Sequence, residues 1–230
     1  MIKVIAFDLD DTLWEVRPVI LRAEKILGSW LSEHAPTVTF NVEEMRHYRE
    51  QLMHQDPSLA GKLTELRRRV IEHAIRQSQL PDEEAARLSQ EAMEVFLRAR
   101  NEIELFEGAM EMLTTLSRSY TLGALSNGNA DIRRVGLDHL FDFAYSAEQV
   151  GAPKPEPHLF EAALQHTGVD PRQMVYVGDD PHLDVDAARQ AGLRTVWVRR
   201  PGKSPGRHTA DATIDHVTEL PGAINRLLNS

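Results

Sequence analysis

Cysteine is absent from this 230-residue chain. Disulfides, thiolate metal ligands and a cysteine nucleophile are therefore excluded. Basic residues are also in the minority: 26 Lys and Arg stand against 35 Asp and Glu, for a formal net charge of −9. Because phosphate backbones attract clustered cations, we expect no nucleic-acid partner. The one dense basic run, Arg67-Arg68-Arg69, lies in a helical stretch and is interpreted as a solvated face.

Long apolar runs are lacking as well. The first residues reach a polar motif at Asp8, which leaves no room for a signal peptide of roughly 15–30 residues. No run approaches the ~20 apolar residues that span a membrane. We therefore expect a cytoplasmic protein without a membrane partner. The 42% of hydrophobic residues is ordinary for a globular protein with a substantial core.

Short apolar runs with strand character occur at the start of the chain and throughout its second half. Residues 2–7 suit a strand buried on both faces. Four further strands are expected at 121–125, 143–145, 174–177 and 195–198. They alternate with helical stretches at 109–118, 156–166 and 184–191, the last ended by Gly192. Strands alternating with helices predict an α/β fold with a doubly wound parallel sheet.

Residues 16–103 contain no convincing strand. Their apolar residues recur at helical spacing, and four residues mark helix starts or boundaries, namely Pro18, Asn41, Pro57 and Pro81. The pattern predicts a four-helix unit inserted after the first strand. The expected domains are an α/β core of residues 1–15 and 104–230 and a helical domain of residues 16–103.

The first chemical motif is Asp8-Leu9-Asp10-Asp11-Thr12. Side chains two apart in a strand point the same way, so Asp8 and Asp10 share a direction if the strand persists. Ligands of open parallel sheets bind beyond the carboxyl ends of the strands. Two carboxylates there repel each other, and Mg²⁺, which prefers oxygen ligands, would relieve that repulsion. Solvated acids after a strand are the alternative for this motif alone.

A second acidic cluster follows the strand at 174–177 and precedes a helix. It contains Asp179, Asp180 and Asp184. Because parallel strands end at one sheet edge, these acids are expected to gather near Asp8, which makes a metal site more plausible than either cluster alone. Asp184 can also act as the N-cap of the helix that follows.

Two further pieces suit phosphate binding. Ser126-Asn127-Gly128-Asn129 follows another strand, and its hydroxyl, amide and backbone N–H groups can hold phosphate oxygens, although this is also a common turn composition. Lys154 lies between two prolines. We expect them to hold the backbone extended and to aim a lysine that neutralises a phosphate and a carboxylate.

In this order the four motifs resemble those of the haloacid dehalogenase superfamily. That pattern is a strand ending in Asp-x-Asp-x-Thr, a strand ending in Ser or Thr, a lysine, and a strand followed by Gly-Asp with a later Asp. The match spans nearly the whole chain. It implies a Rossmann-like core, a helical cap formed by residues 16–103, and hydrolysis of a small-molecule phosphate ester.

The resemblance also implies roles for the motif residues. Asp8 is the nucleophile that becomes an aspartyl phosphate, and Asp10 is the general acid and base. Mg²⁺ is held by Asp8, by the backbone carbonyl of Asp10 and by Asp179. Ser126, Asn127 and Lys154 hold the phosphoryl oxygens. Asp184 supports the site from an outer shell, and Asp180 can be either a ligand or a support.

Details within the motifs narrow the function. The dehalogenases of the superfamily lack an aspartate at the second acid and use no metal, so Asp10 favours phosphoryl chemistry. The surroundings of the first two motifs look most like bacterial flavin mononucleotide (FMN) and pyrimidine-nucleotide phosphatases. A sugar-phosphate phosphatase, a phosphomutase and a non-catalytic binding protein are the alternatives. Trp14 either stacks on a flat substrate or covers the junction between core and cap, and His182 is expected near the site.

Overall fold

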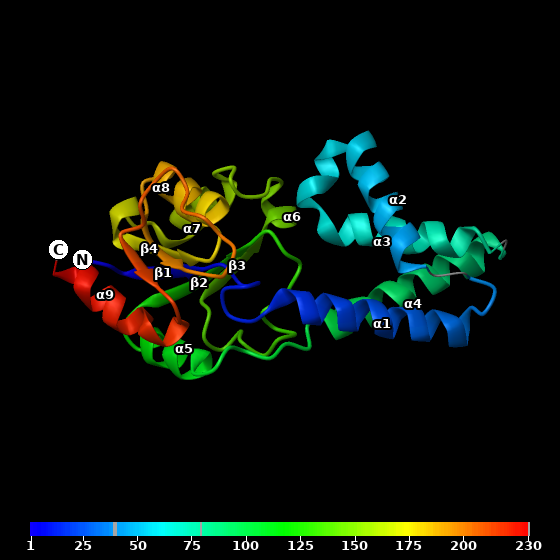
Figure 1. The fold of residues 1–230 in the computed structure, drawn as a ribbon, viewed down its shortest axis with the longest axis horizontal. Coiled ribbons are helices and arrows are strands. Elements are labelled where there is room, and N and C mark those ends of the chain that lie inside the picture. Colours follow the sequence, from blue (N-terminus) through cyan, green and yellow to red (C-terminus); the bar gives the residue numbers. More distant parts are fainter. Residues whose placement is uncertain (39–40, 79, 230) are drawn as a thin grey trace. The chain divides into compact units, whose positions relative to one another are not determined.

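The computed structural model describes residues 1–38, 41–78 and 80–229 (Figure 1). The chain divides into two compact units, one formed by Met1–Glu15 with Glu104–Ser230 and the other by Val16–Ile103. Within the described residues, no helix has the length and apolar character needed to cross a membrane.

The first unit is built on a six-stranded parallel sheet with the order β3-β2-β1-β4-β5-β6. Its strands are β1 (Val4–Phe7), β2 (Thr121–Ser126), β3 (Phe143–Ser146), β4 (Met174–Gly178), β5 (Arg194–Val198) and β6 (Ala212–Ile214). β1 lies between β2 and β4, and all four of its residues are buried. The predicted α/β fold with a parallel sheet is confirmed.

Helices cover both faces of this sheet. They are α5 (Ala109–Ser117), α6 (Ala147–Val150), α7 (His158–Thr167), α8 (Ala187–Gln190) and α9 (Leu220–Leu228). α5 and α9 pack together on one face, and α7 and α8 lie on the other (Figure 1). Short 3₁₀ turns span Pro171–Gln173 and Val217–Glu219, and a π-helical segment spans Pro181–Asp186. Sequence analysis did not identify α6, β6 or α9.

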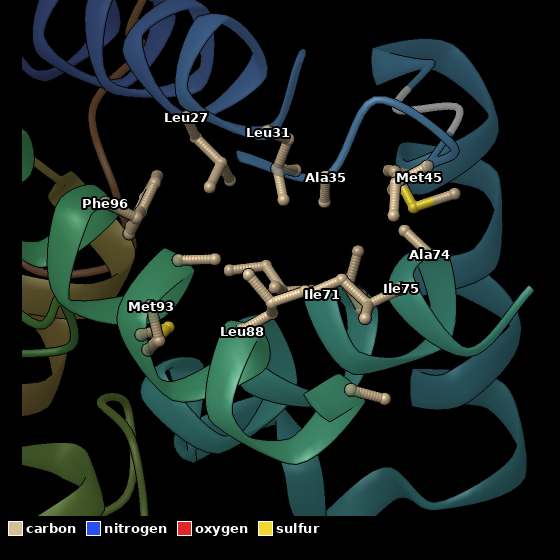
Figure 2. Close-up of a cluster of buried hydrophobic side chains, with 14 of the residues drawn as sticks. Leu27, Leu31, Ala35, Met45, Ile71, Ala74, Ile75, Leu88, Met93 and Phe96 are labelled. Carbon is tan, nitrogen blue, oxygen red and sulfur yellow. The ribbon is translucent and has the colours of Figure 1, made fainter. Parts of the chain in front are cut away.

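The described residues of the second unit form four helices and one 3₁₀ turn. They are α1 (Val16–His34), α2 (Val42–Gln55), the turn Pro57–Gly61, α3 (Leu63–Arg76) and α4 (Asp82–Arg100). Asn41 caps α2 by accepting hydrogen bonds from two backbone N–H groups of its first turn. Pro81 occupies the N-cap position of α4, where an acidic first turn suits the helix dipole. The apolar faces of the helices meet in one buried cluster, part of which Figure 2 shows between Leu27 and Ile75.

The expected solvated face at residues 67–69 is wrong for Arg67. Its Nη1 lies 3.0 Å from Oε1 of Glu24, which is buried, and its guanidinium lies 4.3 Å from the ring centre of Phe96. Arg68 and Arg69 do form surface ion pairs with Glu65. The sequence pattern predicts that Arg67 shares an exposed face with Arg68 and Arg69. Its ion pair with the buried Glu24 turns it toward the interior of the helical unit instead.

Candidate active site

Three neighbouring strands deliver polar side chains to one sheet edge. Asp8 directly follows β1, Ser126 ends β2 and Asp179 directly follows β4. β1 pairs in parallel with both β2 and β4, so these three carboxyl ends adjoin each other. All three side chains are buried. The hydrogen bond from the Asp8 N–H to the Val177 carbonyl, 2.8 Å, extends the pairing past the end of β1.

Lys154 contacts several polar side chains at this edge. Its Nζ lies 2.8 Å from Oδ1 of Asp8 and 2.8 Å from Oδ1 of Asp184, and it also reaches the Tyr176 hydroxyl at 2.7 Å. The Tyr176 hydroxyl in turn donates to the Leu125 carbonyl at 2.9 Å. The ammonium therefore joins one predicted catalytic carboxylate to one predicted supporting carboxylate.

Burial controls the charge state of these groups. It raises the pKa of Asp8 to about 8, with Lys154 pulling the pKa down and Asp184 and Asp179 pushing it up. Burial alone would lower the pKa of Lys154, but the Asp184 and Asp8 carboxylates outweigh it, and the pKa of that ammonium is raised well above its ordinary value. The two carboxylates therefore favour the charged form of Lys154, and a further positive charge beside Asp8 would lower the pKa of that carboxyl.

Asp184 is held firmly on the side of the cluster. Besides Lys154, it accepts a 2.8 Å hydrogen bond from the Asp180 backbone N–H through Oδ2. Gly178 makes room for it, because a Cβ at that position would lie 2.3 Å from the Asp184 carboxylate. The expected N-cap role of Asp184 is wrong. Asp180 is the N-cap of the π-helical segment, and its Oδ1 accepts from two backbone N–H groups.

Asp179 faces a different set of partners. Its Oδ1 accepts a 3.3 Å hydrogen bond from the Thr12 hydroxyl, and its Oδ2 lies 2.7 Å from Nζ of Lys203. The same ammonium lies 2.8 Å from Oδ2 of Asp180. The Trp197 indole N–H donates to the Asp179 carbonyl at 3.0 Å. Burial raises the pKa of Asp179, although Lys203 opposes the shift.

The site suits a hard divalent cation. Asp8, Asp179 and Asp184 each offer a carboxylate oxygen, and these three atoms lie within 4.8 Å of one another. Oxygen donors of this kind match Mg²⁺. Both oxygens of Asp179 and of Asp184, and Oδ1 of Asp8, already have partners, so these contacts do not rank the three carboxylates as direct ligands.

Asp10 is not one of the three carboxylates of this group. β1 ends at Phe7, so the shared strand direction expected for Asp8 and Asp10 does not hold. The chain turns instead at Asp11, whose φ of 59° is left-handed, and Oδ1 of Asp10 accepts a 2.8 Å hydrogen bond from the Trp14 indole N–H. Trp14 is fully buried, so its expected stacking on a substrate finds no support in this arrangement.

The loop after β2 holds the lysine loop in place. The Asn127 side chain accepts a hydrogen bond from the Lys154 N–H at 2.7 Å and donates to the Lys154 carbonyl at 2.9 Å. Ser126 Oγ accepts from the Gly128 N–H at 2.9 Å. The backbone at Lys154 is a turn rather than the expected extended segment, closed by the Glu156 N–H on the Pro153 carbonyl. Asn127, more than the prolines, therefore aims the lysine.

Several contributors were not found in the sequence. Tyr176 looked like an ordinary strand residue, and Lys203 and Arg200 lie in a loop without a motif. Arg200 donates to the carbonyls of Asp11 and Thr12 and so secures the turn after β1. His182 lies near the site as expected, but it is exposed and its Nδ1 contacts Asp186 at 3.1 Å.

A buried lysine thus lies among aspartates at the carboxyl ends of adjoining strands of a parallel α/β sheet. The family model for haloacid dehalogenase-like hydrolases matches residues 2–192. This chain belongs to that family.

Relatives within the family have different activities. The 5-amino-6-(5-phospho-D-ribitylamino)uracil phosphatase YigB of Escherichia coli (strain K12) is 32% identical over 199 residues, which cover 86% of this chain and 84% of the relative. The (S)-2-haloacid dehalogenase 4A of Burkholderia cepacia is 25% identical over 211 residues, covering 89% and 86% of the two chains. A structure titled 2-haloacid dehalogenase, from Pseudomonas syringae pv. Tomato DC3000, superposes with a TM-score of 0.92 at 41% identity over 98% of this chain and 99% of that one.

Proposed function

We propose that the protein is a Mg²⁺-dependent phosphomonoester hydrolase that uses Asp8 as a covalent nucleophile. The observation that carries the proposal is the buried group of Asp8, Asp179 and Asp184, which has Lys154 and Lys203 as its close cationic contacts. Mg²⁺ at Asp8 and Asp179 would screen the repulsion between a phosphate dianion and the attacking carboxylate.

The residues divide the reaction between them. Oδ of Asp8 attacks phosphorus while the bond to the leaving alcohol breaks, and Asp10 protonates that alcohol. In the second step water attacks phosphorus, the Asp8–phosphate bond breaks, and Asp10 takes the proton. Ser126 and Lys154 hold the phosphoryl oxygens, where positioning and electrostatics dominate the rate. Asn127 keeps Lys154 in place, and Asp184 fixes the ammonium from the other side.

Dehalogenation of a 2-haloacid is the second candidate, and the 41% identity to a structure of that title favours it. Both reactions begin with attack by an aspartate. They differ in what surrounds it, because a halide leaves without a proton and the substrate brings one carboxylate rather than a phosphate dianion. Departure of a halide needs no general acid, so Asp10 supports phosphoryl transfer, whereas a base that activates water would serve the second step of either reaction.

The substrate class follows from the phosphatase relative. Its name describes a phosphorylated ribityl chain on a flat pyrimidine. FMN shares the ribityl phosphate, and pyrimidine nucleoside monophosphates share the flat ring. We therefore propose a flat heterocycle on a phosphorylated sugar or ribityl chain as the substrate. The alternative within the same family is a sugar-phosphate phosphatase or a phosphomutase.

A paired assay tests the proposal. Phosphate release from FMN, uridine monophosphate and a ribitylaminouracil phosphate is measured beside chloride release from L-2-chloropropionate, each with Mg²⁺ and with EDTA. We expect Mg²⁺-dependent phosphate release with kcat/KM of at least ~10⁴ M⁻¹s⁻¹ for one of these esters. Chloride release that persists in EDTA, without phosphate release, would establish the dehalogenase instead. A sugar phosphate is assayed in the same way, and a tenfold preference for it would overturn only the substrate class.

A further inference from the structure

A second polar cavity lies at the opposite edge of the sheet from the catalytic aspartates. It encloses about 410 Å³ and is lined by Arg172, Arg189, Gly192, Leu193, Arg194, His208 and Asp211. Arg172 precedes β4, Arg194 opens β5 and Asp211 precedes β6, so the cavity sits at the amino ends of these strands. β4 has five residues, which at about 3.3 Å each separate the two edges by roughly 16 Å. We call this cavity the β4–β6 pocket.

The net charge of this pocket is opposite in sign to that of the whole protein. Three arginines face one aspartate, which leaves an excess of two positive charges with His208 neutral, in a chain whose net charge is −9. A cavity of this size lies within the range of small-ligand sites, about 300–1,000 Å³. The pocket is therefore an open depression with an excess of positive charge.

Two of the arginines are fixed by contacts that leave donors free. Nη1 of Arg189 binds both oxygens of Asp211, at 2.6 and 2.7 Å, and Nη1 of Arg194 donates to the Leu227 carbonyl at 2.6 Å. Asp211 is itself held by the Thr195 backbone N–H at 2.8 Å. A guanidinium carries five N–H donors, so the Nε and Nη2 edges of both arginines have no partner among the described residues.

The third arginine is uncommitted. No hydrogen bond or ion pair in the described part of the chain engages the guanidinium of Arg172, whereas its backbone N–H is fixed on Asp170 at 2.9 Å. Each guanidinium can bind two oxygens of one oxyanion, so three of them suit a multivalent oxyanion. Arg189 and Arg194 are already fixed and would lose little side-chain entropy on binding.

We propose that the β4–β6 pocket binds a small multivalent oxyanion, a phosphate group or a polycarboxylate, through Arg172, Arg189 and Arg194. This site is separate from the catalytic edge and does not depend on the proposed phosphatase activity. Two anion types share this chemistry, and the test distinguishes them.

The test follows backbone amide signals of the metal-free protein by NMR during titration with inorganic phosphate and, separately, with citrate. Gly192 and Leu193 report the pocket, and Gly128 and Gly178 report the catalytic edge. We expect saturable shifts of the pocket amides with Kd in the millimolar range or tighter for at least one anion. Phosphate alone would identify a phosphate-bearing ligand, and citrate alone a polycarboxylate.

Matched variants make the result specific. Arg172→Gln and Arg189→Gln should weaken the pocket response at least tenfold and leave the phosphate response of Gly128 and Gly178 unchanged. Arg118→Gln removes the same charge from an exposed arginine outside the pocket and should change affinity less than twofold. Unchanged thermal unfolding of Arg172→Gln would show that it is folded. Absence of pocket shifts with both anions, or equal affinity in Arg172→Gln and Arg118→Gln, would overturn the proposal.

Discussion

At the scale of single residues, the structure gives Trp14 different contacts from those that its sequence position suggests. An aromatic after the first motif suggests stacking, yet the ring is fully buried and its N–H binds Asp10. Asp10 is the proposed general acid. A buried indole donor binds that carboxyl group, and we propose that Trp14 positions Asp10.

Trp14→Phe keeps the buried ring and removes the hydrogen bond. We expect about a tenfold or greater loss of kcat with an alkyl phosphate, whose leaving group needs a proton, because general acid catalysis contributes about 10²–10⁴-fold. An aryl phosphate such as p-nitrophenyl phosphate should lose less than about threefold, since its leaving group needs little protonation. Trp30→Phe, in the helical unit, is the matched control. Equal losses with both substrates would show a general structural effect.

The raised pKa of Asp8 predicts how stability depends on pH. In the metal-free folded protein this pKa is about 8, against 3.8 ordinarily, so the folded state holds the proton more tightly than the unfolded chain does. The contribution of Asp8 therefore favours folding at low pH and is lost as the pH rises through about 8. Stability relative to Asp8→Asn should fall by up to about 1.4 kcal/mol per pH unit between pH 5 and 8.

Urea unfolding in EDTA measures this difference. Wild type and Asp8→Asn are compared at several values between pH 5 and 8, so that the titration of groups away from Asp8 cancels in the difference. Parallel pH profiles of the two proteins would contradict the raised pKa.

The sequence predicts a residue's presence at the site better than its contacts. Asp8 and Asp179 lie close together because parallel strands bring their carboxyl ends to one edge, and Lys154 contacts Asp8 from a loop. The lysine's partner Tyr176 was missed, because its hydroxyl role depends on a residue 22 positions away along the chain. Lys203 lies in a loop without a motif, so the sequence does not indicate its contacts with Asp179 and Asp180.

At the scale of elements, two glycines lie in strands of the sheet, one packed against a core side chain and the other against a side chain of the site. A Cβ on Gly123 would lie 2.1 Å from the Phe143 ring, and one on Gly178 would lie 2.3 Å from the Asp184 carboxylate. Both substitutions to alanine should cost about 1–3 kcal/mol of unfolding free energy through overpacking.

Only Gly178→Ala displaces the carboxylate that holds Lys154. We expect its kcat to fall at least tenfold under conditions where the protein is folded, while folded Gly123→Ala keeps most of its activity. Urea unfolding and steady-state kinetics on the same samples separate the two effects. Similar kcat values for the two variants would remove Asp184 from the proposed support of Lys154.

Element boundaries follow the sequence where local signals are strong. The caps of α2 and α4 and the strands β1 to β5 lie close to their expected positions. The segment after β5 was not identified, because β6 has three residues and α9 begins beside a proline. The helix expected at 184–191 instead begins with a π-helical segment, whose N-cap Asp180 starts the turn earlier.

At the scale of the whole molecule, the chain is two units with separate cores. The helical unit leaves and rejoins the first unit at neighbouring points, because Trp14 and Leu105 form an antiparallel bridge and the Phe106 N–H donates to the Leu13 carbonyl at 2.8 Å. We propose that residues 16–103 are a cap that selects the substrate while the core performs the chemistry.

Replacing Val16–Ile103 by a short Gly-Ser linker tests this division. We expect the remaining core to fold, to hydrolyse p-nitrophenyl phosphate slowly, and to lose at least tenfold of its preference among phosphorylated metabolites. Circular dichroism and the ratios of kcat/KM provide the measurements. A folded core that retains the original preference would place specificity outside the helical unit.

The central claim is that Asp8 becomes phosphorylated, and the direct measurement is detection of that covalent intermediate. Asp10→Asn removes the group that activates water, so with an aryl phosphate the formation of the intermediate should outpace its breakdown. Rapid acid quench, digestion and mass spectrometry should then find a hydroxylamine-labile phosphate on the peptide that contains Asp8. Asp8→Asn must abolish it. Repeated absence of this phosphate while Asp10→Asn still turns over would contradict the account and favour attack by a metal-activated water.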